Sequence, residues 1–421
     1  MGGGALVALF RPPVVCYATV LLREMRILSL STVFPSPANP VFGTFVCSRL
    51  QHLAAMPDVS LRVAAPVPVL DYANYRRRFF RLWDVPWHGL EGNLPVVRPR
   101  WIYPPIAGGS NGLLLGIELA PYLALLRRSF RFELIDAHFA YPEGVAAAIL
   151  STIFRCPFTI TLRGNEVDHL RSWIKRKWMR WALSRASRVF AVSGRLRAFA
   201  VSNGAAASRT LVVPNGIDPS LFHPRDRQEM RRRHAIAPAD LLVVSAGNLI
   251  ELKGHHRVVR AVKAARDQGL AARLVVVGGG PNAPFAAGIR RTVDEAGMAE
   301  HVHFAGRVGA ETMAEWMSAA DVLCLASDRE GWPNVVHEAL ACGTPVVATD
   351  VGGVPDLIPA SDFGIVVPPG DQASLDQAVC EALTRSWNHD AIAAWGMSRT
   401  WTAVAADVFR EWSAVLEEPI A

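Results

Sequence analysis

The sequence predicts an α/β protein with two doubly wound parallel sheets, each in its own domain. The chain has 421 residues, of which 51% are apolar and 19% are charged, a length and composition typical of a globular protein with two or more domains. Short apolar runs alternate with amphipathic stretches, as expected of strand–helix units that bury a parallel sheet on both faces. Near residues 213–218 a Pro-Asn-Gly sequence ends one series of runs and turns the chain.

Buried strands are expected on both sides of this break. In the first half they span residues 27–31, 61–65, 134–137, 158–162, 188–192 and 210–213. In the second half they span residues 241–246, 273–277, 302–305, 322–325, 345–348 and 364–367. A helix is expected over 45–55. The segment 66–106 is rich in Pro, Trp and Arg, has no clean period, and is interpreted as an irregular insertion.

The domain boundaries follow from these elements. The first domain is expected at residues 25–213 and the second at 214–399, with a last helix over 400–418. Residues 1–24 are interpreted as a disordered extension or a mis-assigned start, with Met25 as the natural first residue. Their apolar run, Val14–Leu22, is shorter than the roughly 20 residues that cross a bilayer, and no small-residue cleavage site follows it.

Charge is distributed unevenly along the chain. Residues 1–214 hold 26 Lys and Arg against 11 Asp and Glu, a net charge of +15, whereas residues 215–421 carry −8. A cationic half suits nucleic acid, an anionic membrane or a phosphorylated substrate, and the lack of a recognisable reader motif disfavours nucleic acid. The segment 171–185 places apolar residues at helical spacing beside cations, which suits either a membrane surface or a helix packed on the sheet. The cluster Arg76-Arg77-Arg78 leaves the same alternatives open.

No metal or cofactor is expected from the sequence. The six cysteines are scattered, without a CxxC pair or a Cys/His cluster at metal-ligand spacing, so buried free thiols are expected. The glycines at 278–280 follow a strand, but Ala283 stands where a dinucleotide fingerprint needs its third glycine. A tight strand-to-helix turn is therefore predicted there.

Two glutamates form the most informative pattern. Glu330 lies in a loop after a strand, and Glu338 lies on the next helix, with Pro333 at its first position. The free amides at this helix N-terminus can bind a diphosphate, helped by the helix dipole. Glu330 can then accept hydrogen bonds from sugar hydroxyls, and Glu338 from ribose hydroxyls on the other side of the phosphates. For two isolated acids, a turn cap at Glu330 and a solvated Glu338 would be the simpler interpretation.

The two acids belong to a longer pattern. Residues 330–338 form Glu-x7-Glu within EGWPNVVHEALACGTPVVATDVGGVPD, which resembles the signature of the retaining family-4 glycosyltransferases of GT-B fold, the glycosyl transferases group 1. Further matching motifs extend from Met25 over nearly the whole chain: the Gly43 loop, DAHF (136–139) before Gly144, TLRG (161–164), VPNGID (213–218), GNLIELKG (247–254) and VGGGP (277–281). The resemblance implies two Rossmann-like domains facing across a cleft. The first would be the acceptor side and the second the donor side, with helix 400–418 packed back on the first.

The resemblance also implies roles for residues at matching positions. Glu330 would contact hydroxyls of the donor sugar, Glu338 would hold the nucleotide ribose, and Lys253 would neutralise the donor diphosphate. Backbone groups would complete the phosphate cradle at Gly43, Asn334 and Val335. His138 would lie near the reacting sugar, where it acts either as a base or as a positioning group.

Two positions depart from the family pattern. Asn248 stands where an arginine is frequent, so one cation expected at the diphosphate is replaced by a group that can only hydrogen-bond. Arg163 stands where a histidine is common, and it either restores the lost charge from the opposite domain or pairs with an acid such as Glu166 or Asp168.

The family implies a hexosyl transfer from a nucleoside-diphosphate sugar to a glycan or lipid-linked acceptor in cell-surface polysaccharide biosynthesis. The GNLIELKG and TLRGNEV segments resemble bacterial exopolysaccharide and teichuronic acid glycosyltransferases. Front-face attack with retention is expected, and no Asp-x-Asp metal motif lies near the site. The cationic first domain suggests a cytoplasmic protein, peripheral on the inner membrane face. Two alternatives stay open: a GT-B sugar-nucleotide epimerase, active without acceptor, and a nucleotide-sugar-binding subunit without catalysis.

Overall fold

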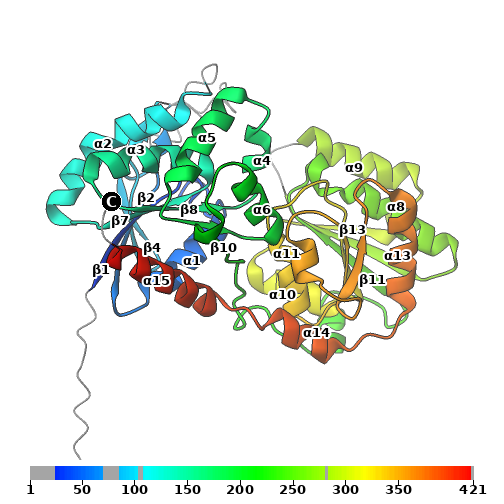
Figure 1. Ribbon diagram of the computed structural model, residues 1–421. Coiled ribbons are helices and arrows are strands. Elements are labelled where there is room, and N and C mark those ends of the chain that lie inside the picture. The colour runs from blue at the N-terminus through cyan, green and yellow to red at the C-terminus, as the bar shows by residue number, and fades with distance from the viewer. Residues whose placement is uncertain (1–23, 70–84, 103–107, 280–282, 419–421) are drawn as a thin grey trace, which may run out of the picture.

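The computed structural model describes residues 24–69, 85–102, 108–279 and 283–418, which form two lobes, each built on one sheet (Figure 1). The first sheet has the strand order β10-β9-β8-β7-β1-β2-β5-β4, and the second has β13-β12-β11-β14-β15-β16. Neighbouring strands of both sheets are parallel except for the antiparallel pair β4 and β5 at one edge. The predicted α/β class with two doubly wound parallel sheets is confirmed.

The strands predicted from apolar runs are all present, with ends shifted by at most two residues. The first sheet contains β1 (Met25–Leu30), β2 (Val59–Ala64), β4 (His88–Glu91), β5 (Leu94–Val97), β7 (Leu134–His138), β8 (Phe158–Leu162), β9 (Arg188–Ala191) and β10 (Thr210–Val212). The second contains β11 (Leu241–Ala246), β12 (Ala272–Val277), β13 (Val302–Gly306), β14 (Val322–Leu325), β15 (Val346–Thr349) and β16 (Gly364–Val367). A separate short parallel pair consists of β3 (Val67–Pro68) and β6 (Arg100–Trp101).

The expectation of an irregular insertion over 66–106 is wrong for its described part, because the hairpin β4–β5 extends the first sheet there. Leu94 and Val96 are buried on either side of an exposed Pro95, so the strand does alternate. Gly92 turns the hairpin with a φ of 63°, a conformation that glycine adopts freely. Pro95 precedes Val96 and Val97, the two residues of β5 that pair with β2, so the proline is tolerated there, and it conceals the period in the sequence.

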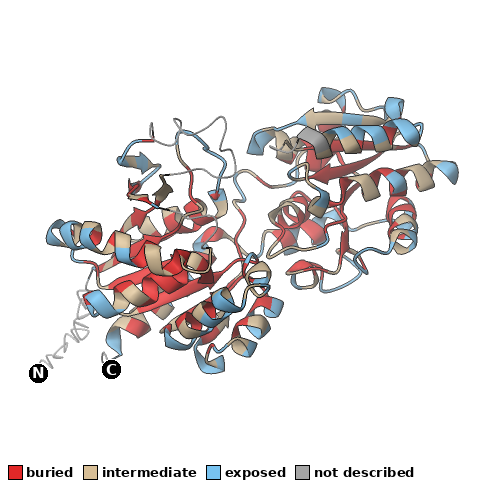
Figure 2. Cartoon of the chain, turned by 90° about the horizontal axis from the view of Figure 1, so that it is seen from above, coloured by how far each residue is buried: buried red, intermediate tan, exposed pale blue. Residues whose placement is uncertain are grey.

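Helices cover both faces of each sheet (Figure 1). On the first sheet, α2 (Asn111–Ser129), α3 (Val145–Phe154) and α5 (Trp173–Arg185) pack on one face, and α1 (Thr44–Ala54) and α15 (Trp401–Glu417) on the other. On the second, α8 (His255–Asp267), α9 (Ala283–Glu295) and α13 (Gln372–Thr384) cover one face, and α7 (Arg227–Arg233), α10 (Ala310–Ala319), α11 (Asn334–Ala341), α12 (Val354–Leu357) and α14 (His389–Gly396) the other. The shorter helices α4 (Glu166–His169) and α6 (Gly194–Ser202) follow β8 and β9. Figure 2 shows the buried residues concentrated in the sheets and on the helix faces that cover them.

The chain crosses between the lobes twice, and the two crossings are hydrogen-bonded to each other. The amide of Ile217 donates to the carbonyl of Arg399 at 2.9 Å, and the amide of Trp401 donates to the carbonyl of Ile217 at 3.2 Å. After the second crossing, α15 packs beside α1 and buries the side chains of Trp401 and Trp412 against the first sheet. The last helix of the chain therefore completes the core of the first lobe.

Several expectations concern residues outside the described part of the chain. These are the extension 1–24 apart from Glu24, the cluster Arg76-Arg77-Arg78, Cys16, and Gly280 of the glycine turn. The five cysteines within the described residues are free and buried, as predicted. Among the described helices, none combines the length and the apolar character needed to cross a bilayer.

Candidate active site

Two loops of the second lobe bring Lys253 and Glu330 together. The Nζ of Lys253 donates to Oε1 of Glu330 at 2.6 Å, and the hydroxyl of Ser327 donates to the same oxygen at 2.7 Å. The side chains of Lys253 and Glu330 are 22% and 10% exposed. The two residues expected at the diphosphate and at the donor sugar thus form a half-buried ion pair.

The local sequence explains why these loops meet. Lys253 ends the 3₁₀ turn η4 (Glu251–Lys253), and Gly254 follows with a φ of 66°. A Cβ on Gly254 would lie 2.0 Å from the carbonyl oxygen of Ala326, so only glycine permits this approach of the two loops. The amide of Asp328 also donates to the carbonyl of Leu252 at 2.9 Å. Backbone contact therefore holds Lys253 beside the loop that carries Glu330.

Helix α11 presents free amides next to this pair. Its first hydrogen bonds run from the amides of Val336 and His337 to the carbonyl of Pro333. The amides of Asn334 and Val335 precede these bonds and make none within the described residues. Pro333 is the N-cap and lies one residue before the predicted position. Free amides at a helix N-terminus form an anion site.

Glu338 lies one turn further along the same face of α11. Its side chain is half-buried and accepts no hydrogen bond from the described residues. Burial raises the pKa of Glu338 to about 7. The simpler interpretation of a solvated Glu338 is therefore wrong, and the carboxylate has unused acceptor capacity next to the anion site.

In the first lobe, His138 and Arg163 lie at the carboxyl ends of the neighbouring strands β7 and β8. The Nη2 of Arg163 lies 3.1 Å from Nδ1 of His138, and Nε lies 3.4 Å from the same atom. The Nε2 of His138 lies 3.1 Å from Oδ2 of Asp136. Because a guanidinium only donates, Nδ1 must accept, and the proton of neutral His138 stays on Nε2 beside Asp136.

Burial sets the protonation of both side chains. It lowers the pKa of His138 to about 4, although the Asp136 carboxylate opposes this and the charges of Arg163 and Arg49 add to it. Burial also lowers the pKa of Arg163 to about 9, with a further contribution from Arg49. At neutral pH His138 is therefore neutral and fully buried, while Arg163 keeps its charge.

A chain of hydrogen bonds runs from His138 across the hinge into the second lobe. Arg163 Nη1 donates to Oδ1 of Asn215 at 3.0 Å, and Nδ2 of Asn215 donates to Oδ1 of Asn334 at 3.0 Å. We call His138, Arg163, Asn215 and Asn334 the inter-lobe hydrogen-bond chain. It joins the carboxyl end of the first sheet to the anion site at α11.

The lobes also touch directly beside Glu330. A Cβ on Gly331 would lie 1.8 Å from the carbonyl oxygen of Arg163, and one on Gly164 would lie 2.6 Å from Cα of Gly331. Arg329 forms an ion pair with Asp168 across the same contact. Glycine on both sides thus lets the two backbones meet without intervening side chains.

The other two predicted site residues lie at the edges of this region. Gly43 precedes α1 with a φ of 75°. The first turn of α1 lies near the site, since the guanidinium carbon of Arg163 is 5.0 Å from the centre of the Phe45 ring. Asn248 is exposed, next to Gly247, whose Cβ position lies 3.5 Å from the side chain of Lys253. The predicted pairing of the Arg163 side chain with Glu166 or Asp168 is not found among the described ion pairs: only the backbone amide of Arg163 donates to Glu166, and Asp168 pairs with Arg329.

Sequence reasoning missed Asn215, Ser327 and Glu143 as members of the site. The Pro-Asn-Gly sequence predicts only a chain turn at Asn215, although an asparagine between Pro and Gly in a hinge can also bridge two lobes. Glu143 accepts from the amide of Thr32 at 2.9 Å and thereby fixes the loop after β1. Burial raises the pKa of Glu143 to about 7. The contacts of Asn215 with Asn334 and of Glu143 with Thr32 join residues more than 100 positions apart and leave no local signal.

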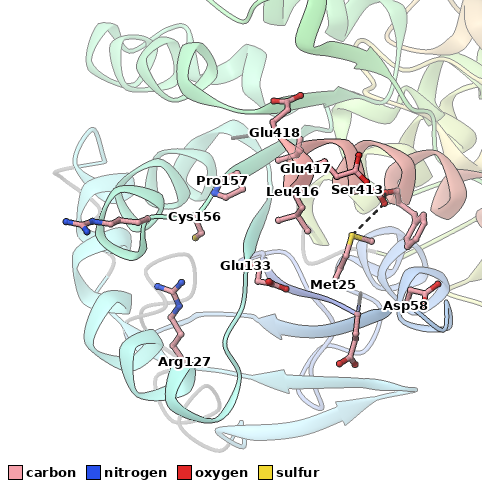
Figure 3. Close-up of a pocket in the computed structure, with 14 residues that line it drawn as sticks. Met25, Asp58, Arg127, Glu133, Cys156, Pro157, Ser413, Leu416, Glu417 and Glu418 are labelled. Atoms are coloured by element: carbon pink, nitrogen blue, oxygen red, sulfur yellow. Dashed lines mark hydrogen bonds between the residues drawn. The ribbon is translucent and has the colours of Figure 1, made fainter. Parts of the chain in front are cut away.

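A pocket of about 410 Å³ lies elsewhere, at the amino ends of β1, β7 and β8 beneath the end of α15 (Figure 3). Met25, Cys156 and Leu416 line it, and the hydroxyl of Ser413 lies 3.8 Å from the Met25 sulfur. Five acidic residues and only two arginines surround it, namely Glu24, Asp58, Glu133, Glu417, Glu418, Arg127 and Arg155. This composition does not suit an anionic donor.

No group of three or more His, Cys, Asp or Glu within the described chain could hold a metal ion.

Comparisons with known proteins identify the family of this chain. Residues 66–221 match the family model for Glycosyltransferase Family 4, and residues 240–385 match that for Glycosyl transferases group 1. A Bacillus subtilis protein named as a teichuronic acid biosynthesis glycosyltransferase is 30% identical over 87% of this chain and 90% of its own length. A D-inositol 3-phosphate glycosyltransferase of Actinosynnema mirum is 36% identical over 48% of this chain and 54% of its own.

Solved structures share the fold. Sucrose-phosphate synthase of Thermosynechococcus elongatus superposes with a TM-score of 0.73 at 20% identity, covering 93% of this chain and 98% of that one. HepE of Anabaena, solved in complex with UDP, gives 0.69 at 20% identity, covering 93% and 100%. At these identities the likeness shows the GT-B fold alone.

Proposed function

We propose a reaction for this chain, which belongs to the glycosyltransferases of group 1 and family 4. It transfers a hexosyl unit from a nucleoside-diphosphate sugar to a glycan or lipid-linked acceptor. The transfer retains the anomeric configuration and serves cell-surface polysaccharide biosynthesis. The observation that carries this proposal is the arrangement around α11. Lys253, the free amides of Asn334 and Val335, and the Glu338 carboxylate lie in the order that a diphosphate and a ribose require. Anabaena HepE, which shares the fold, has been solved with UDP-glucose.

The reaction follows from where charge develops. The bond between the sugar C1 and the diphosphate oxygen breaks, and its electron pair leaves with the nucleoside diphosphate. Fixed donors that meet this growing negative charge stabilise the transition state. We assign this task to Lys253, Arg163 and the α11 amides, and the proposal needs no metal ion. The acceptor hydroxyl attacks C1 on the face that the diphosphate leaves, and its proton passes to the departing phosphate oxygen.

For His138 we propose a positioning role in place of a catalytic one. Its side chain is fully buried, Nε2 faces Asp136 and Nδ1 accepts from Arg163. A base must reach the proton that it abstracts through a free lone pair, and neither ring nitrogen offers one. His138 instead fixes the plane of the Arg163 guanidinium, which has further N–H groups for a phosphate or sugar oxygen.

The proposal is tested by donor binding and turnover of the purified protein with UDP-, GDP- and ADP-sugars. We expect one nucleotide class to raise Tm and to bind in calorimetry, and the Lys253→Met variant to bind it at least tenfold more weakly, since a charge-assisted bond is lost. Transfer should require an acceptor. Conversion of the donor without acceptor would favour an epimerase, and binding without any turnover would favour a silent subunit.

Donor affinity should depend on pH through Glu338. In the free protein this carboxyl has a pKa of about 7, and ribose hydroxyls that donate to the ionised form lower it. The nucleoside-diphosphate sugar, whose diphosphate is esterified at both ends and does not titrate near neutral pH, therefore binds most tightly above pH 7, and its affinity falls about tenfold per unit as the pH drops below 7. Calorimetry at pH 6, 7 and 8 measures this slope. In Glu338→Gln the slope should vanish, which separates Glu338 from Glu143 of similar pKa; an unchanged slope would refute the assignment.

We further propose that the first lobe contacts an anionic membrane through α5. Trp178 and Trp181 pack toward the core, as the structural interpretation of this helix expects, but Trp173 and Ile174 at its start are 61% and 39% exposed. Three exposed cations follow them, Arg176, Lys177 and Arg180. Exposed aromatic and basic residues on one helix suit the headgroup region of an anionic bilayer. On this ground we propose that the protein acts at the cytoplasmic face of the membrane, and we propose no nucleic-acid partner.

Vesicle sedimentation tests this contact. Replacing Arg176, Lys177 and Arg180 by glutamate should weaken binding to vesicles with anionic lipid by at least fivefold per charge, because each cation contributes about 1 kcal/mol. Neutral phosphatidylcholine vesicles should bind neither protein. As a matched control, Lys263→Glu on α8 of the second lobe should bind like the wild type. Equal binding of the α5 variant would exclude this surface.

A further inference from the structure

Asn215 occupies the first crossing between the lobes and contacts a charged group of one lobe and an amide of the other. Its side chain is 5% exposed. Oδ1 lies 3.0 Å from Nη1 of Arg163, which follows β8, and Nδ2 lies 3.0 Å from Oδ1 of Asn334, the first residue of α11. The side chain therefore connects a buried cation with the helix N-terminus that forms the anion site.

The chemistry of these groups fixes the orientation of both amides. A guanidinium carries only N–H donors, so Asn215 must present its oxygen to Arg163. Its nitrogen then faces Asn334, which must present its own oxygen in return. The Nδ2 of Asn334, with two N–H groups, is left without a partner among the described residues, next to the free amides of Asn334 and Val335. With the opposite orientation, Asn334 would offer a phosphate an oxygen, which repels it.

We propose that Asn215 is a positioning residue that decides which atom of the Asn334 amide, nitrogen or oxygen, faces the diphosphate site. It holds the Asn334 amide so that Nδ2 donates to a phosphate oxygen, and it does so only while Arg163 of the first lobe fixes Asn215. Closure of the two lobes is therefore coupled to the orientation of the Asn334 amide. This inference rests on the proposed function, because it requires a diphosphate at the N-terminus of α11.

A double-mutant cycle on the full chain tests the coupling, with UDP, GDP and ADP as probes in calorimetry. Asn215→Ala and Asn334→Ala should each raise the Kd of the bound nucleoside diphosphate about tenfold. The double variant should be no weaker than the weaker single variant, because both changes remove the same donor. Asn93→Ala, an exposed asparagine of the β4–β5 hairpin, serves as the matched control and should leave Kd unchanged.

A second variant, Asn215→Asp, allows the proposal to be tested even if Asn215→Ala folds poorly. Asn215→Asp has the same shape and still accepts from Arg163, but it offers only oxygen to Asn334 and reverses that amide. Its Kd should rise more than that of Asn215→Ala, and most of the rise should disappear when Asn334 is alanine. A rise of equal size in both backgrounds would be a plain charge effect and would overturn the proposal.

The remaining outcomes are separable. Binding by the wild type together with additive or absent effects of the Asn215 variants overturns this inference and leaves the proposed function standing. A purely structural role would lower Tm in Asn215→Ala and give additive effects. Failure of the wild type to bind any of the three nucleoside diphosphates overturns the proposed function, and this inference with it.

Discussion

Turnover of the Glu330→Gln variant is expected to fall by roughly 100-fold or more, as for the loss of one preorganised transition-state contact. At the same time, the nucleoside diphosphate should bind at least as tightly as to the wild type. The reason is the ion pair between Glu330 and Lys253 at 2.6 Å. Removing the negative partner leaves the Lys253 charge free for the phosphates, whereas the sugar loses the acceptor that orients it.

Steady-state kinetics with the best donor, together with calorimetry of the nucleoside diphosphate, measure both effects. Glu251→Gln is a matched control, since Glu251 begins the same 3₁₀ turn but is exposed; it should behave as the wild type. The opposite pattern, weaker nucleotide binding with turnover retained, would mean that Glu330 holds the loop and does not contact the sugar. Near-normal values of both quantities would remove Glu330 from the site.

The Gly331→Ala variant is expected to lose turnover by about 100-fold, while its nucleotide affinity falls by no more than the roughly tenfold expected for Asn215→Ala. A Cβ at this position would lie 1.8 Å from the carbonyl oxygen of Arg163, so the two backbones must separate. A displacement of about 1 Å between reacting groups is enough for a loss of this size. Lys253, Glu338 and the α11 backbone amides belong to the second lobe and still bind the nucleotide. The loss of affinity is therefore limited to the Asn334 donor that Arg163 holds through Asn215.

Kinetics, calorimetry and small-angle scattering in the presence of the nucleoside diphosphate measure this prediction. Scattering should show a larger radius of gyration for the variant than for the wild type, because the lobes are held apart. Gly288→Ala is the control: its Cβ meets nothing within 4 Å on α9, and alanine favours a helix. Full activity of Gly331→Ala would show that the contact between the lobes is not part of the reactive state.

The fold could be predicted from the sequence because its signals are local. Parallel strands buried on both faces appear as short apolar runs, and those runs gave every strand of both sheets except the hairpin and the short pair within 66–106. The hairpin strands escape this rule because β4 lies at the edge of the sheet and is largely exposed, and because Pro95 interrupts the apolar run of β5. Glu330 and Lys253 could also be predicted, because each lies in a contiguous motif, residues 330–338 and 247–254, that resembles the family.

The part of the site that joins the lobes could not be predicted in the same way. Asn215 is 52 residues from Arg163 and 119 from Asn334 in sequence, and no periodicity connects these positions. The role of His138 could not be predicted from the sequence for the same reason. Its residue type suggests a base, but the role depends on Asp136 and Arg163, whose contacts with both ring nitrogens exist only in the folded chain.

The return of α15 to the first lobe has a consequence for biosynthesis. The first sheet is complete when residue 212 has been made, but one of its faces is covered by Trp401, Val404, Val408 and Trp412. A ribosome adds these residues last, so the first lobe must wait through the synthesis of the entire second lobe with this apolar face covered in part by α1 and otherwise exposed. A message truncated before residue 400 would therefore yield an aggregation-prone product, even though every residue of the nucleotide site would be present.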